Sequence, residues 1–420
     1  MRSSQMKTTL KPGLSRRRGW AISTVMSIIV LLVVIGMGML SLSLHSQAFA
    51  MRSNSEMIAR CAADAGVAKV LNLMNQEYQG GSMDSDYLGF SQGDVLWQGD
   101  YETLPNCNGG FSYKVSLGSG GIYNVEVTGE SGQAQNTINC FLKLQGPFEY
   151  AVLTRGDIVL KSGTTVSGYN SSDLGDPDMS ARIATISTDS DSITLNSGVT
   201  VNGTVYVGVD GWPDTVIKDL GATTGPKFAM SEEPPLPQVV VPALTDYSSD
   251  IIAKGETITV TPAESGIYDS IQLKKAALAG VLEISGGDVA LVITDDIQMG
   301  QDCEIVINEG ASLTLYLAGD LNADNNSGFN NRTKIPSNLK IFGTSSEEQQ
   351  MDVKAKSDVF GAVYAPNADI TVYASGDVYG SFVASNFELK SSGNFYYDRA
   401  LKDYTDKKEL LRFVVTRWQE

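Results

Sequence analysis

Carboxylates are the side chains of this chain that could carry out acid–base chemistry, because it has 48 acidic residues and a single histidine, His45. Asp295 and Asp296 form an adjacent acidic pair inside a strand-rich run, and paired carboxylates can hydrolyse glycosides. In so acidic a chain, a solvated corner is the simpler interpretation of this pair. A serine triad would need a histidine in the body of the protein, whereas His45 lies at the end of a long apolar segment. With no Walker A or dinucleotide-binding glycine pattern, the sequence predicts no enzyme.

Oxygen and sulfur ligands for a metal ion are scattered along the chain. Three aspartates between positions 173 and 178, and two at 189 and 191, could bind Ca²⁺ through hard oxygens. The stretch 322–328 lacks the spacing and the terminal glutamate of an EF-hand loop. The four cysteines include no CxxC pair, which a structural zinc site would require. We therefore expect neither a specific metal site nor a cofactor.

The charge of the chain divides into two unequal parts. Residues 1–19 contain six basic residues and no acidic one, whereas the rest carries 25 basic and 48 acidic side chains, a net charge of −23. A body this acidic has no surplus of Lys and Arg to neutralise phosphates, so we exclude nucleic acid as a partner. The hydrophobic content of 42% and the 42 glycines favour packed, mainly β structure.

Residues 20–44 form an uncharged apolar run, which as a helix would extend about 37 Å and cross a bilayer. Since a basic leader over 1–19 stays on the cytoplasmic side of the inner membrane, the body is expected in the periplasm or outside the cell. A cleavable signal peptide is the alternative, because residues 47–50 end in a small-x-small pattern. Its apolar core would be about half as long, and the helical pattern continues without a proline to Tyr78.

The segment 45–146 is expected to form a helix and an antiparallel sheet. Alternating runs over 111–117, 122–128 and 137–144, separated by glycine-rich turns, predict the strands. In an extracytoplasmic location, a disulfide bond between Cys107 and Cys140 could tie a loop to the last strand. Apolar residues every three or four positions predict the helix face that packs on the sheet: Met57, Ile58, Cys61, Ala62, Ala65, Ala68, Leu71 and Met74.

A basic leader that ends in Arg16-Arg-Arg-Gly19, an apolar run that starts at Trp20 and an uninterrupted helix together resemble the amino terminus of type IV pilins. They most closely resemble PilX-type minor pilins, over about residues 14–78. The resemblance implies that prepilin peptidase cuts after Gly19 and that the helix packs against other pilin-like subunits. Major pilins have glutamate at the fifth mature position, where this chain has Thr24. The resemblance therefore favours a minor or initiating subunit.

Residues 147–398 consist of short β runs separated by Gly, Asn and Asp. The run at 357–364 is echoed nineteen residues later at 376–383. Repeats of this size, with alternating apolar residues, predict successive coils of a parallel β-solenoid; a β-sandwich is the alternative. The proline-rich stretch 231–242 is interpreted as a strap, which either separates two parts of the solenoid or lies along one continuous solenoid.

Motifs at 286–289, 311–316, 361–368 and 393–398 resemble an uncharacterised bacterial domain that often follows PilX-type amino termini in surface proteins. This resemblance spans about residues 262–401.

The last segment, 399–420, is predicted to be a helix that caps the final coil. Asp406 and Glu409 are spaced as a capping box. The apolar face of this helix would contain Leu410, Leu411, Phe413, Val414 and Trp418.

These features predict an α+β, mainly β chain: a long transmembrane and amphipathic helix with a small pilin-like sheet, a parallel β-solenoid and a carboxy-terminal helix. The predicted function is that of a minor pilin or pseudopilin-like subunit of a type IV pilus or related filament. It would display the solenoid for adhesion or subunit contact. The expected partners are the membrane, other pilin-like subunits and a surface or glycan ligand. A membrane-anchored enzyme that acts on surface polysaccharide and a bactofilin-like scaffold are the alternatives.

Overall fold

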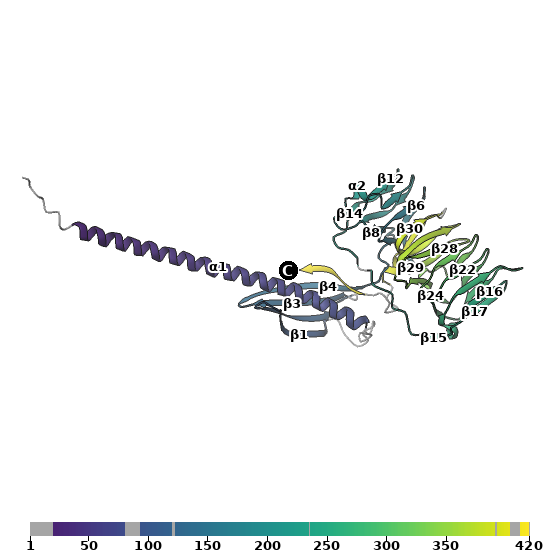
Figure 1. The fold of residues 1–420 in the computed structure, drawn as a ribbon, viewed down its shortest axis with the longest axis horizontal. Helices are drawn as coiled ribbons and strands as arrows, with labels where there is room; N and C mark the ends of the chain where they lie inside the picture. Colours follow the sequence, from purple (N-terminus) through teal and green to yellow (C-terminus); the bar gives the residue numbers. More distant parts are fainter. Residues whose placement is uncertain are drawn as a thin grey trace, which may run out of the picture.

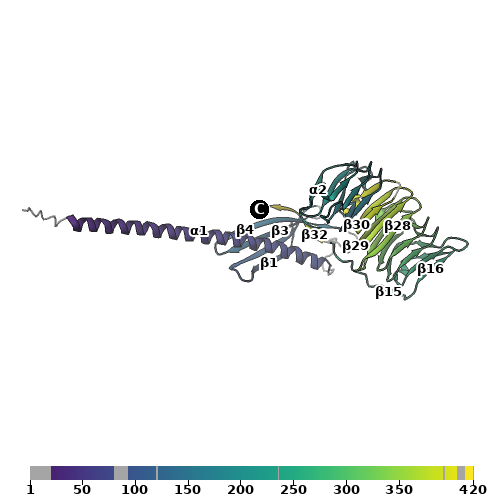
Figure 2. The ribbon, with the colours of Figure 1, turned by 45° about the horizontal axis from the view of Figure 1, so that its top comes forward.

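The computed structural model of the chain describes residues 20–79, 93–119, 122–234, 236–390, 393–403 and 412–419. Its first element is the helix α1 (Trp20–Gln79), whose carboxy-terminal half lies against an antiparallel sheet while its amino-terminal half projects away from the rest of the protein (Figure 1). A larger, mostly parallel β domain lies beyond the other end of the sheet, and the rotated view in Figure 2 shows the same arrangement.

The antiparallel sheet, called sheet A, has the strand order β1-β2-β3-β4-β32. The three strands predicted from alternating residues are confirmed as β2, β3 and β4. The bounds of the five strands are Val95–Thr103 (β1), Gly109–Leu117 (β2), Ile122–Ser131 (β3), Ala134–Gln145 (β4) and Arg412–Gln419 (β32).

The helix face that packs on sheet A matches the predicted one in part. Ala62 and Met74 are buried as predicted, whereas Met57, Cys61 and Ala68 are exposed. Further buried positions lie outside the predicted set: Ala59, Ala63, Val67, Val70 and Tyr78. Small residues decide the orientation, because a Cβ built on Gly129 of β3 would lie only 2.0 Å from the carbonyl oxygen of Ala59. The helix backbone therefore approaches the sheet where only alanine and glycine leave room.

The carboxy terminus is a strand, and the predicted capping helix over 399–420 is wrong for the residues described there. Residues Arg399–Asp403 form one short 3-10 turn (η4), and residues 412–419 form β32, which pairs antiparallel with β4. Phe413 is buried between sheet A and α1, and its ring lies edge-on to those of Tyr78 and Tyr123. The side chain of Asn75 accepts a hydrogen bond from the N–H of Phe413 (2.7 Å). Tertiary pairing thus overrides the local helix signal; Asp406 and Glu409 lie outside the described residues.

Residues 147–403, called here the parallel domain, wind so that each strand pairs in parallel with a strand of a neighbouring winding. Three ladders result. In spatial order, the first contains β15 (Thr245–Asp246), β18 (Gly266–Tyr268), β21 (Asp288–Ile293), β24 (Ser312–Leu317), β27 (Leu339–Gly343), β29 (Val359–Ala374), β30 (Val378–Leu389), β5 (Val152–Thr154), β8 (Ala181–Thr185), β11 (Gly203–Val207) and β14 (Lys227–Ala229).

The second ladder shares β29 and β30 with the first, because these long strands turn a corner. It contains β16 (Ile251–Lys254), β19 (Ile271–Lys274), β22 (Ile297–Met299), β25 (Leu321–Ala323), β28 (Gln349–Ala355), β29, β30, β6 (Ile158–Leu160), β9 (Ile193–Leu195) and β12 (Ile217–Asp219).

The third side is formed by two groups of strands. They are β17 (Thr257–Val260), β20 (Val281–Ile284), β23 (Glu304–Ile307) and β26 (Gly328–Asn331), and then β31 (Phe395–Asp398), β7 (Thr165–Tyr169), β10 (Thr200–Val201) and β13 (Thr223–Thr224). Short helical turns are α2 (Pro213–Val216), η2 (Pro262–Glu264) and η3 (Pro336–Asn338).

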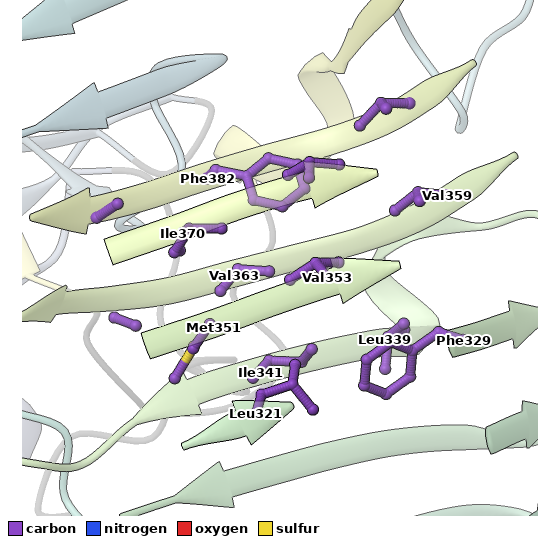
Figure 3. Packing of buried hydrophobic residues seen from close by; sticks show 14 of the residues in the cluster. Leu321, Phe329, Leu339, Ile341, Met351, Val353, Val359, Val363, Ile370 and Phe382 are labelled. Carbon is purple, nitrogen blue, oxygen red and sulfur yellow. The ribbon is translucent and has the colours of Figure 1, made fainter. Parts of the chain in front are cut away.

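In-register columns of apolar side chains fill the interior, and Figure 3 shows part of this core. One column continues through the second ladder without interruption from end to end. Its members are Ile251, Ile271, Ile297, Leu321, Met351, Ile370, Phe387, Ile158, Ile193 and Ile217. All ten are buried, so the column, with the backbone pairing around it, holds neighbouring windings together.

The order of windings in space is permuted relative to the sequence. Residues 245–398 come first in the stack and residues 152–229 follow, because β30 pairs with β5 and β6, and β31 pairs with β7. Residues 230–244, which contain the proline-rich stretch, connect the two free ends of one continuous stack. Ten interstrand steps along the first ladder correspond to roughly 48 Å, and these fifteen residues in extended form span roughly 50 Å.

The proline-rich segment lies along the outer face of the first ladder. The hydroxyl of Tyr364 donates a hydrogen bond to the carbonyl oxygen of Pro237 (2.7 Å). Leu236, Val239 and Leu244 pack against an apolar cluster that includes Tyr316 and Phe342. Of the two predicted arrangements, the one along a continuous stack is therefore observed.

Substitution Gly129→Ala tests the close contact between α1 and sheet A. The added Cβ would meet backbone atoms of Ala59 and Ala63, which cannot rotate away, so we expect a loss of about 1–3 kcal/mol in stability. Thermal unfolding of the full chain in detergent, followed by circular dichroism, would measure it. Gly175→Ala in an exposed loop is the control, with an effect within about 0.5 kcal/mol; equal melting temperatures of the two variants would contradict the contact.

Candidate functional surfaces

The amino-terminal half of α1 exposes an unbroken apolar surface. From Trp20 to Ala50 the helix has no Lys, Arg, Asp or Glu, and large apolar side chains between Ile22 and Met51 are largely exposed. Val33, near the middle, is 48% exposed. Among the described residues, α1 is long enough and apolar enough to cross a membrane. A continuous apolar surface of this length requires a lipid or protein environment that removes it from water.

Of the two residues at the predicted processing site, Gly19 lies outside the described residues and Trp20 is the first residue of α1. The described part of α1 therefore starts at the first residue of the apolar run. The first ion pair along the helix joins Arg52 to Glu56 (3.1 Å), beyond the apolar half.

The predicted disulfide bond between Cys107 and Cys140 is absent, and both residues are free thiols. Cys107 lies in the loop before β2, whose first residue Gly109 is in register with Ser131 and, through it, with Ala134 at the start of β4. Cys140 is six residues further along β4, roughly 20 Å away, whereas a disulfide needs Cα atoms within about 7 Å. Burial raises the pKa of the Cys140 thiol to about 11, as expected for an inert core thiol.

Aspartates at the corners of the parallel domain join one winding to the next by hydrogen bonds. Asp296, one of the predicted acidic pair, accepts a hydrogen bond from the N–H of Asp320 (2.8 Å), and Asp320 in turn accepts one from the N–H of Gln350 (2.8 Å). A second row repeats the pattern: Asp358 accepts from the N–H of Asp377 (2.9 Å) and Asp377 from that of Asn394 (2.7 Å). The carboxylates thus replace water as acceptors for corner N–H groups.

In the acidic loop at 173–178, one arginine pairs with two of the three aspartates. Arg399 donates to Asp176 Oδ2 (3.0 Å) and to Asp178 Oδ2 (3.0 Å). Hydrogen bonds from the N–H of Asp178 to Asp176, and from Ser180 to Asp178, hold the pKa of each carboxyl below its usual range. Within the described part of the chain, no three His, Cys, Asp or Glu side chains gather in a group that could hold a metal ion. The guanidinium of Arg399 joins the two carboxylates by charge-assisted hydrogen bonds.

Asp398 fixes the same loop from inside the protein. It is fully buried, with 0% exposure, and accepts hydrogen bonds from the N–H of Ser171 (3.0 Å), the hydroxyl of Ser171 (2.6 Å) and the N–H of Ala400 (3.1 Å). It lies at the end of β31, so it joins the last winding in sequence to the first.

A cleft of about 450 Å³ lies between sheet A and the parallel domain. Sequence patterns gave no signal for it, because its walls come from β4, β32, the start of the parallel domain and the proline-rich segment. Burial lowers the pKa of Arg412 and raises that of Tyr150 to about 12. The charged residues that line the cleft are Lys143, Glu149, Arg182, Glu232, Lys402 and Arg412.

Comparisons with known proteins give one family match and one distant structural similarity. A family described as a domain of unknown function (DUF7305) matches residues 222–404, a range that contains the windings from β15 to β31. The competence-associated pilin ComZ from Thermus thermophilus is similar in structure at 12% sequence identity, covering 87% of this chain and 97% of that one, with a TM-score of 0.22. No curated protein sequence matches the chain.

Substitution Asp398→Ala tests the buried corner. Removing the carboxylate leaves the partly buried N–H groups of Ser171 and Ala400 without their acceptor, which costs up to about 1–3 kcal/mol for each. Asp398→Asn keeps one acceptor oxygen and should lose clearly less. Chemical denaturation of both variants would compare them, and equal losses would show that the N–H groups find other acceptors.

Proposed function

We propose that this chain is a non-enzymatic, membrane-anchored subunit of a type IV pilus or related filament, and that its parallel domain is a β-solenoid displayed outside the inner membrane. The exposed apolar half of α1 is the observation that carries the proposal. The same helix is apolar all round in one half and packs by a narrow alanine-rich face in the other. A helix of this kind can be held by a bilayer before assembly and by neighbouring helices afterwards.

Sheet A supports this reading, because it covers only the carboxy-terminal half of α1 and leaves the apolar half free to pack elsewhere. A helix that served solely as an anchor would need about 20 residues, whereas α1 has 60. The remaining length forms the core of the soluble unit with sheet A.

The absence of an acidic residue at position 24 bears on the kind of subunit. Between Trp20 and Ala50 the helix offers no carboxylate that could pair with a neighbouring subunit's amino group. We infer that this chain is a minor or initiating subunit, of which few copies are needed, and not the major subunit that repeats along the filament.

The parallel domain supports a display role through its stacked ladders and its shared interior column. A stack of this type is long and rigid relative to the number of residues that form it. Its outer faces are available for contact. We propose that these faces serve adhesion or contact with other subunits, and that the amino terminus remains cytoplasmic while the body faces outward.

The mature amino terminus tests the filament part of the proposal. Intact-mass measurement of the chain from its native host should show a protein that begins at Trp20, because cleavage after Gly19 is what the pilin reading requires. Gly19→Val should keep residues 1–19 attached. A chain that begins at Met1, or after Ala50, would exclude processing of this kind.

Membrane retention tests the role of the apolar helix half separately. Val33→Asp places a charge near the centre of the apolar run, at a cost of about 2.5–3.5 kcal/mol in a bilayer. We expect a smaller fraction of the chain in washed membranes and in sheared filaments. Leu174→Asp, at a residue that is 85% exposed on the parallel domain, is the matched control and should change neither fraction; a normal Val33→Asp distribution would speak against membrane insertion.

A further inference from the structure

The cleft between sheet A and the parallel domain has a charge opposite to that of the body around it. Its walls carry four cationic side chains and two carboxylates, within a body whose net charge is −23. One of these cations, Arg182, is ion-paired with Glu149 (3.0 Å) and is still half exposed. The positive potential of these side chains attracts small anions into the cleft, against the repulsion that the acidic surface around it exerts.

The guanidinium groups in the cleft suit a carboxylate. Arg182 comes from β8 and Arg412 from β32, so both units must be in place to form the site. Guanidinium groups bind carboxylates through two parallel hydrogen bonds, which gives geometric selectivity as well as affinity.

The remaining wall suits hydroxyl groups and an apolar ring face. Tyr150 and Tyr206 line it as an edge-on pair, with ring centroids 6.2 Å apart. The phenol of Tyr150 is protonated at neutral pH and can donate a hydrogen bond. Ser231 and Thr416 add hydroxyls. The volume, about 450 Å³, lies in the range of small-ligand sites and is too small for a folded partner.

We propose that this cleft binds a small acidic carbohydrate, a mono- or disaccharide that carries a carboxylate. The carboxylate lies between the cationic groups, and the sugar ring and hydroxyls contact the tyrosines and the hydroxyl side chains. The inference refines the display role proposed above and rests on it only for its biological setting. Binding in detergent can therefore fail while amino-terminal processing succeeds, or the reverse.

Calorimetric titration of the full chain in detergent with digalacturonate tests the proposal, with the neutral disaccharide galactobiose as the matched ligand. We expect digalacturonate to bind at least about tenfold more tightly than galactobiose, and its affinity to fall as salt is added. Arg182→Gln should weaken digalacturonate binding by about tenfold, as expected for the loss of a charge-assisted contact. Glu149→Gln should strengthen it, because a competing carboxylate is removed. Lys161→Gln, on the parallel domain outside the cleft, should have no effect.

Three results would overturn the proposal. One is equal affinity for the acidic and the neutral disaccharide, or no binding of either. Another is binding of inorganic phosphate or of an acidic peptide as tight as that of digalacturonate, since the site would then read charge alone or a different class of ligand. The third is weaker binding by Glu149→Gln, which would show that the pair with Arg182 is needed intact.

Discussion

The parallel pairing of β30 with β5 and β6 is the contact on which the rest of the structure depends. It joins segments far apart in the chain, and the hydroxyl of Ser381 adds a hydrogen bond to the carbonyl oxygen of Tyr150 (2.6 Å) across the same join. Because the join lies inside the stack, both free ends of the stack are made by residues in the middle of the sequence. The proline-rich segment must then travel the full length of the domain, and prolines favour the extended form that this requires.

The join also determines how the two units are connected. The beginning and the end of the parallel domain lie side by side. The hydroxyl of Tyr397 donates a hydrogen bond to the carbonyl oxygen of Phe148 (2.7 Å). The chain can therefore leave sheet A after β4 and return to it as β32, directly beside β4. The cleft forms between these two crossings, which explains why residues before position 235 and residues after position 401 both line it. Glu149 follows the connection from β4 into the parallel domain, and Arg412 follows the connection back to sheet A.

The sequence predicts those elements whose causes are local. The uninterrupted apolar run determines α1, and the alternation over 111–144 determines β2, β3 and β4. At the carboxy terminus the sequence predicts the wrong element, because Asp406 and Glu409 are spaced as a helix start. The observed strand depends on the β-branched run Val414-Val-Thr416 pairing with β4. The permuted order of windings and the cleft could not be predicted, since each depends on pairings over more than 200 residues. Corner aspartates such as Asp296 were recognisable as turn residues, but their row of hydrogen bonds depends on the register of the stack.

Neighbouring entry and exit points give the parallel domain a modular character. The helix and the first four strands of sheet A constrain the unit between β4 and β32 in one respect only. The two ends of that unit must lie side by side. The inserted unit could therefore be exchanged for another while α1, sheet A and the closing strand stay unchanged. A change in the shape or size of this unit would then leave the packing of α1 on sheet A unaffected.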